Sequence, residues 1–376
     1  MGLNSRRSRS TQAGFTLVEI LVGLGIGLLA TVVIIQVMSV FEVQRRTTTG
    51  TADAQTNGGI ALYVISRELS MAGYPLLPVT NSALECTALT INGVADATVP
   101  IRVSPVAVAD GVSDAITMRY GTSIMGGVPT QFSAAPVGNV VAVISNLGCA
   151  AGDIALITSG TTCAITTATA VTGNTVPNMT LTLANTTGAA TGANVACMGT
   201  WNEVTYRVNA GNLERCVLAT AAAAGGDCNP ATVNNANFIP SVAGVVNLQV
   251  QYGVSAAGLP NSDPNFNQIV QWVDAKTVGG LNWAAPAVVD RNRIKALRLA
   301  VVARNAKKEL AVVPSSTVCS SLTAAAPTGL CAWAGTAASP APAIDVSADA
   351  NWQYYRYRVF ETIIPLRNII WARDTL

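Results

Sequence analysis

The pattern of apolar and polar residues separates one long apolar segment near the N-terminus from a much longer mixed region. Residues 15–41 read FTLVEILVGLGIGLLATVVIIQVMSVF and contain a single charged side chain, that of Glu19. A helix of this length spans about 40 Å, which exceeds the roughly 30 Å hydrocarbon core of a bilayer. The segment is therefore predicted to be a transmembrane helix.

The helix is predicted to continue outside the membrane through residues 42–73. Residues 42–56 are polar, and Asn57-Gly58-Gly59 is expected to weaken or break the helix. After this point an apolar stripe recurs with helical spacing at Leu62, Ile65, Leu69 and Ala72. Gly73 and Pro75 then form a stop signal. Such a stripe is more typical of a face turned to a core than of a partner site.

Alternating apolar positions from about residue 80 onward predict a β-rich head over residues 74–376. The strand candidates are 115–121, 139–145, 153–160, 179–185, 204–208, 213–219, 245–253, 294–304 and 354–366, with a hairpin turn at 209–212. A helix is expected over 266–275, after Asp263-Pro264. Long loops or irregular edges are expected at 161–194 and 219–237, and an insertion or linker at 314–350. The predicted class is α+β, with a long N-terminal helix packed on a mostly antiparallel sheet.

Composition argues against an enzyme and against a nucleic-acid-binding protein. Charged residues make up 11% of the chain, against about 25% in an average soluble protein, and the formal net charge is +2. This balance gives no reason to expect a polyanionic partner. The sequence has no histidine and no recognisable nucleophile–base pair, P-loop or dinucleotide fingerprint. We therefore expect no catalytic residue, no metal site and no cofactor.

Eight cysteines all follow the apolar segment. An even number of cysteines on one side of a membrane anchor is typical of disulfides in an oxidising compartment. Two pairs bracket short loops and are expected to form local bridges, Cys216–Cys228 and Cys319–Cys331. The other four cysteines leave three pairings open. Of these pairings we favour Cys149–Cys163 together with Cys86–Cys197.

The N-terminal residues 1–14, MGLNSRRSRSTQAG, are basic and contain no acid, which favours a cytoplasmic location for this end of the helix. The motif G-F-T-L-V-E at 14–19, followed by the apolar run, resembles the type IV pilin family and its type II secretion relatives. The resemblance implies that a prepilin peptidase cleaves the leader after Gly14 and methylates the new N-terminal amine of Phe15. It also implies that Glu19 of an incoming subunit neutralises the N-terminus of its neighbour during assembly.

An ordinary secretory signal peptide and a plain membrane anchor are the alternatives for this segment. The apolar run is too long for a signal peptide, and no A-x-A cleavage site precedes a mature domain. A carboxylate inside an apolar helix is costly and is functional by default, which disfavours a plain anchor.

The C-terminal pattern YRYRVFETIIPLRNIIW at 355–371, together with the hairpin and the strand at 245–253, resembles PilW-type minor pilins. The resemblance implies a pilin fold and a priming role at the pilus tip. The implied partners are the inner membrane, the prepilin peptidase, the major pilin, other minor pilins and a tip-associated adhesin. The protein would first be a single-pass inner-membrane protein with a periplasmic head, and later part of the extracellular pilus. The J-type minor pseudopilin of type II secretion and a ligand-binding adhesive head are the alternatives.

Aromatic residues are concentrated in one short segment near the C-terminus, at Trp352, Tyr354, Tyr355 and Tyr357. They could form a surface platform, although aromatic-rich strands usually belong to a core.

Overall fold

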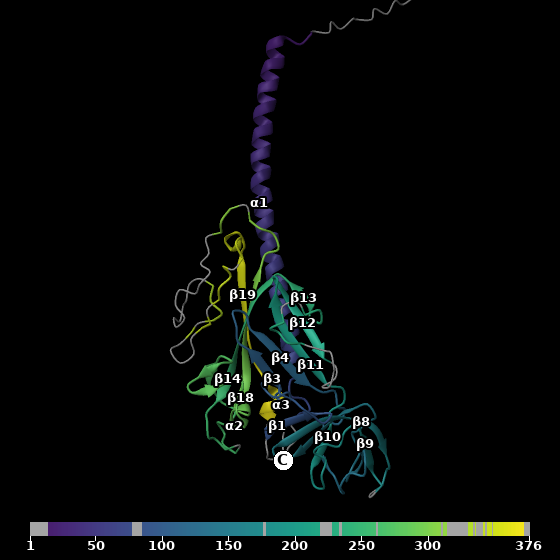
Figure 1. Ribbon diagram of the computed structural model, residues 1–376. Helices are drawn as coiled ribbons and strands as arrows, with labels where there is room; N and C mark the ends of the chain where they lie inside the picture. The colour runs from purple at the N-terminus through teal and green to yellow at the C-terminus, as the bar shows by residue number, and fades with distance from the viewer. Residues whose placement is uncertain are drawn as a thin grey trace, which may run out of the picture. The chain divides into compact units, whose positions relative to one another are not determined.

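The chain divides into two units, Met1–Thr49 and Gly50–Leu376, and helix α1 (Leu17–Leu69) contributes residues to both. In the described part of the first unit, the large apolar side chains of α1 are exposed. The second unit holds the rest of α1 and all the described strands (Figure 1). The computed structural model describes residues 14–76, 85–175, 178–218, 228–232, 235–260, 262–309, 311–313, 330–333, 335, 341–342, 344–347 and 349–371.

The largest sheet of the second unit has eight strands and forms what we call the satellite region. Its strands are β1 (Ala88–Ile91), β2 (Val94–Ala95), β5 (Thr130–Gln131), β6 (Val140–Ala142), β7 (Ile154–Ser159), β8 (Thr162–Thr172), β9 (Thr180–Leu183) and β10 (Asn194–Cys197). The order is β2-β1-β8-β7-β10-β5, with β9 beside β8 and β6 beside β9. Strands β1 and β8 are parallel, and the other described pairs of this sheet are antiparallel.

Two further antiparallel sheets, the central sheets, pack with α1. One has the order β13-β12-β11-β4-β3 and the other β15-β14-β18-β19. Their strands are β3 (Val106–Ala109), β4 (Ala115–Tyr120), β11 (Asn202–Asn209), β12 (Asn212–Leu218), β13 (Ile239–Ala243), β14 (Val245–Ser255), β15 (Ile269–Val273), β18 (Ile294–Arg304) and β19 (Tyr357–Pro365). The short elements are β16 (Thr277–Val278), β17 (Leu281–Asn282), α2 (Val288–Arg291), α3 (Arg367–Trp371) and the 3₁₀ turn Trp352–Tyr354.

Helix α1 and the two central sheets share one hydrophobic core. Ile65 and Leu69 of α1 are fully buried in the same cluster as Val204 of β11 and Leu299 of β18. Burying each such aliphatic side chain contributes about 1.5–3 kcal/mol, so this contact stabilises the attachment of the helix to the sheets. The apolar stripe predicted from the sequence is confirmed.

The expected weak point at Asn57-Gly58-Gly59 is wrong, because α1 is continuous from Leu17 to Leu69. The glycines serve close packing instead. A Cβ atom added at Gly58 would overlap the ring of Phe360 on β19, and one added at Gly50 would lie 2.9 Å from the Cβ of Asn305. Small residues therefore let the helix backbone approach the sheet.

The strand candidates at 115–121, 153–160 and 294–304 coincide with β4, β7 and β18. The hairpin is also confirmed, since β11 and β12 are joined through Ala210 and Gly211, both at positive φ. The helix expected over 266–275 is wrong.

Strand β15 occupies the middle of residues 266–275, where the helix was expected, and pairs with β14. Its Trp272 packs over the backbone of Gly253, where a Cβ would lie 2.8 Å from the indole ring. The expected loop at 161–194 is likewise wrong, because β8 and β9 lie within it. Much of the loop stretches at 219–237 and 314–350 lies outside the described residues.

Three disulfides are present among the described residues. Cys216–Cys228 has the pairing expected from the sequence. The other two are Cys86–Cys163 and Cys149–Cys197, which corrects the pairing favoured above. Cys331 is also disulfide-bonded, whereas Cys319, its expected partner, lies outside the described residues.

Strand register explains the corrected pairing. Cys163 lies at the turn end of the β7–β8 hairpin, opposite Thr158, whereas Cys149 precedes the other end of β7. About five strand residues, or roughly 16 Å, separate these ends, too far for a disulfide. Parallel β1–β8 pairing places Leu89 opposite Cys163, which brings Cys86 close to it.

Replacing Gly58 by alanine tests the close packing of α1. Alanine favours a helix by about 1 kcal/mol over glycine, but the overlap with Phe360 should lower the free energy of unfolding by about 1–3 kcal/mol. Gly59→Ala is the matched control, since a Cβ there meets nothing within 4 Å. Urea unfolding of the full chain in detergent would measure both. A Gly58→Ala variant as stable as the Gly59→Ala variant would contradict the packing argument.

Candidate assembly segment and head pocket

The first turn of α1 holds the residues singled out at the N-terminus. Thr16 precedes the helix, and the backbone N–H of Glu19 donates to Thr16 Oγ1 at 3.3 Å. The sequence T-x-x-E at 16–19 is a capping-box pattern, a local signal that the sequence analysis did not use. A carboxylate in the first turn is also stabilised by the helix dipole. Glu19 therefore fits the start of the helix independently of any role in assembly.

Gly14 and Phe15 lie immediately before α1 and are accessible. The side chain of Phe15 is 79% exposed, and a Cβ added at Gly14 would meet nothing within 4 Å. The structure thus brings the three predicted residues together at one exposed helix end. An enzyme acting on the Gly14–Phe15 bond would meet no obstruction from the described residues around Gly14.

The apolar surface of α1 that follows is suited to a membrane. The helix is long enough to cross one, and its most apolar 18-residue window has a mean hydropathy of 2.6 with none of the window buried. Leu28, Leu29 and Ile34, which lie on three different sides of the helix, are all more than half exposed. Apolar side chains around the whole circumference are typical of lipid exposure.

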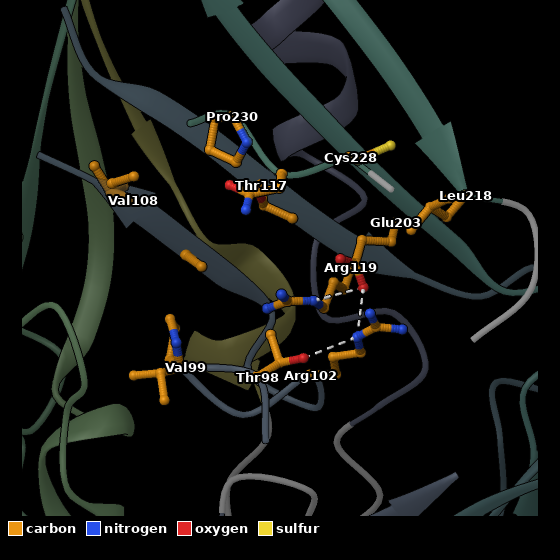
Figure 2. A pocket seen from close by; sticks show the side chains of 14 residues that line it. Thr98, Val99, Arg102, Val108, Thr117, Arg119, Glu203, Leu218, Cys228 and Pro230 are labelled. Atoms are coloured by element: carbon orange, nitrogen blue, oxygen red, sulfur yellow. Dashed lines mark hydrogen bonds and ion pairs between the residues drawn. The ribbon is translucent and has the colours of Figure 1, made fainter. Parts of the chain in front are cut away.

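The second unit contains a pocket of about 380 Å³ beside β3, β4 and β11 (Figure 2). Its lining includes the polar and charged side chains of Thr98, Arg102, Thr117, Arg119 and Glu203. Cys228, which also lines it, is disulfide-bonded. The described lining residues contain no nucleophile–base pair.

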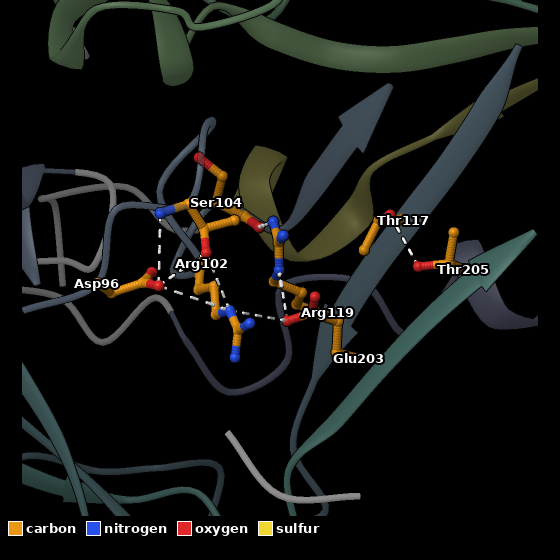
Figure 3. A network of polar contacts seen from close by, with 8 residues as sticks. Asp96, Arg102, Ser104, Thr117, Arg119, Glu203 and Thr205 are labelled. Atoms are coloured by element: carbon orange, nitrogen blue, oxygen red, sulfur yellow. Dashed lines mark hydrogen bonds and ion pairs between the residues drawn. The ribbon is translucent and has the colours of Figure 1, made fainter. Parts of the chain in front are cut away.

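A buried ion-pair network accounts for the charges of this pocket (Figure 3). Arg119 of β4 and Glu203 of β11 are cross-strand partners, with Nε to Oε2 at 3.1 Å. Arg102 lies 3.9 Å from the same carboxylate oxygen and 3.8 Å from Asp96 Oδ1. Two cations thus face two anions among the described residues, so the network is balanced in charge and attaches the segment around Arg102 to the sheet.

The backbone carbonyl of Ser104 strengthens the same attachment. It accepts a hydrogen bond from Arg119 Nη1 at 3.1 Å, while Thr98 Oγ1 accepts one from Arg102 Nε at 3.3 Å. Glu203 is 84 residues from Arg119 in the sequence, and the register of β4 and β11 brings the two side chains together. Sequence reasoning missed the network because no single segment contains its pattern.

The described residues thus combine an exposed apolar N-terminal helix with a β-rich, disulfide-bonded unit. Residues 206–368 match the sequence model of the family described as Type IV Pilus-assembly protein W, PilW. The resemblance to PilW that the sequence predicted is thereby confirmed for this segment.

Other comparisons give more distant or negative results. A type IV-like pilin from Thermus thermophilus is similar in structure, with 14% sequence identity and a TM-score of 0.34. The similarity covers 84% of this chain and 97% of that one. No curated protein matches the chain.

Replacing Glu203 by glutamine tests the network. The substitution leaves Arg119, which is only 3% exposed, without its carboxylate partner. Breaking a buried pair in this way should lower the free energy of unfolding by about 3 kcal/mol. Lys276→Gln is the control, because Lys276 is 55% exposed and its ion pairs should contribute less than about 1 kcal/mol. Equal effects of the two substitutions in urea unfolding would rule out the proposed importance of the network.

Proposed function

We propose that the chain is a minor pilin-type subunit that helps to start assembly of a type IV pilus and remains at its tip. Two independent features at opposite ends of the chain carry the proposal. The motif G-F-T-L-V-E stands at 14–19, and the PilW match covers 206–368. The PilW match also favours a pilus over a type II secretion system.

Charge pairing in the membrane supplies the physical reason for assembly. Cleavage after Gly14 would create an ammonium group on Phe15, which remains charged after methylation. An isolated charge in lipid is costly, as is the carboxylate of Glu19. Pairing the Glu19 of one subunit with the Phe15 ammonium of a neighbour would remove both costs together. Major pilin and other minor pilins are the proposed neighbours, and a prepilin peptidase is the proposed processing enzyme.

The size of the head favours a position at the tip. The chain beyond Gly73 has about 300 residues, which corresponds to a radius of gyration near 19 Å if compact. Heads within a pilus shaft must pack against subunits above and below, and a head of this size would crowd that packing. At the tip no subunit lies above it, so there is room for the head and for an adhesin bound to it.

Replacing Glu19 by valine separates processing from assembly. The variant should still be cleaved after Gly14 and begin at Phe15, because its cleavage site is unchanged. It should nevertheless be lost from sheared pili and from co-purified minor pilins, since the neighbouring ammonium would lack its partner. N-terminal sequencing and immunoblotting of the pilus fraction would measure the two steps. Glu42→Gln, which removes an acid just past the apolar segment, should behave as the wild type.

Wild-type recovery of Glu19→Val in pili would refute the pairing role. A mature protein that does not begin at Phe15 would refute the processing site.

The number of copies per pilus tests the tip position. Quantitative mass spectrometry of purified pili, sorted by length, should find a small and constant number of copies in each filament. Deleting the protein should remove surface pili without lowering the amount of major pilin in the cell. A copy number that grows in proportion to pilus length would overturn the tip position while leaving the pilin assignment intact.

A further inference from the structure

The end of the β18–β19 strand pair extends into a segment rich in basic and aromatic residues. Arg304, the last residue of β18, is the register partner of Tyr357, the first residue of β19. Beyond these two residues the segments that follow β18 and precede β19 stay side by side, since the N–H of Asn305 donates to the carbonyl of Arg356 at 3.2 Å. We call residues 304–309 and 352–358 the basal rim.

The basal rim has a surplus of positive charge. It contains five basic residues and one acid, Glu309. Glu309 pairs with Arg356 at 3.1 Å, and Arg304 pairs with Asp349 outside the rim. The three remaining basic residues have exposed side chains and form no ion pair with another described residue: Lys307, Lys308 and Arg358. In a chain with only 11% charged residues, such a local excess is unusual.

Aromatic rings lie among these cations. Lys308 Nζ lies 4.3 Å from the ring centre of Tyr354, and the guanidinium of Arg304 lies 4.2 Å from that of Tyr355. Both tyrosines and Trp352 are half-buried, so each presents part of its ring to the surface. Half-buried Tyr and Trp beside Lys and Arg are the composition found where proteins meet the headgroup layer of a membrane.

The basal rim lies where the chain enters the second unit. Asn305 packs against Gly50, the first residue of that unit, and Arg356 and Arg358 line a small groove with Thr51 and Ala54. Only eight residues lie between Phe41, the end of the apolar run, and Gly50, and in a helix the distance from Phe41 to Gly50 along the axis is about 14 Å.

The headgroup layer fills roughly 5–8 Å of the distance between Phe41 and Gly50, and long basic side chains can reach across the remainder. The rim cations are therefore within reach of lipid phosphates.

We propose that the basal rim binds the phosphate groups of anionic phospholipids on the membrane face from which the head projects. The contact would hold the head against the membrane until the subunit leaves it for assembly. Each basic side chain near an anionic surface should strengthen the contact about fivefold. The proposal rests on membrane anchoring by residues 15–41, but it does not depend on the pilus role.

The distribution of lysines allows a direct test in the full chain. The sequence has four lysines, of which Lys307 and Lys308 lie in the rim, Lys276 is exposed elsewhere, and Lys295 is fully buried. The chain would be inserted into nanodiscs of phosphatidylcholine, with or without phosphatidylglycerol, and acetylated with an amine-reactive ester. Mass spectrometry would then give the labelling rate of each lysine.

Phosphatidylglycerol should slow the labelling of Lys307 and Lys308 about fivefold and leave that of Lys276 unchanged. High salt should restore the rates, because it screens exposed charges. Arg358→Gln should recover part of the labelling in anionic discs. Arg67→Gln is the matched control and should not change the labelling. It removes an exposed arginine near the other end of the helix segment in the second unit.

Equal labelling of Lys307 and Lys308 in the two kinds of disc would overturn the proposal. Protection by soluble glycerol phosphate in phosphatidylcholine discs would also overturn it, because the site would then recognise a free phosphate. Failure of the chain to enter either disc would contradict the anchoring itself, and with it both this proposal and the proposed function. Normal protection in a chain that forms no pili would support the lipid contact alone.

Discussion

Helix α1 must offer apolar side chains around its whole circumference in one half and a narrow contact face in the other. From Leu17 to Phe41 large side chains point in every direction, as lipid requires. From Gly50 onward the buried positions are mostly small until Ile65. Because Gly58 lacks a side chain, the ring of Phe360 can lie on the helix backbone, and this contact fixes β19. The central sheet that contains β18 and β19 depends on that position, and so does the basal rim at the end of these two strands.

Prediction from the sequence succeeded where the signal was local and failed where it came from a distant partner. Strands such as β4 and β18 carry strong apolar patterns of their own, and the N-terminal motif lies within six residues. By contrast, the close packing at Gly58 involves Phe360, about 300 residues away. The Arg119–Glu203 pair likewise depends on the register of two strands, which no single segment encodes.

Two groups of charges in the second unit differ in how they are balanced. The arginines at 102 and 119 face carboxylates and are largely withdrawn from water, so they hold the protein together. The basal rim keeps cations in solvent with too few acids nearby. Buried balanced charge stabilises a particular arrangement of segments, whereas exposed unbalanced charge is available to a partner. The distribution of charge thus separates a structural ion-pair network from the surface that we propose to bind lipid.

The bridges Cys86–Cys163 and Cys149–Cys197 interleave along the chain, because the second begins before the first is closed. An oxidant that joined cysteines in the order of their export would link Cys86 to Cys149. A Cys86–Cys149 disulfide is not native, so it would have to be exchanged before the satellite region could form its strand register. Oxidative folding of this head therefore depends on thiol–disulfide exchange, or on delayed oxidation, to a degree that consecutive bridges would not require.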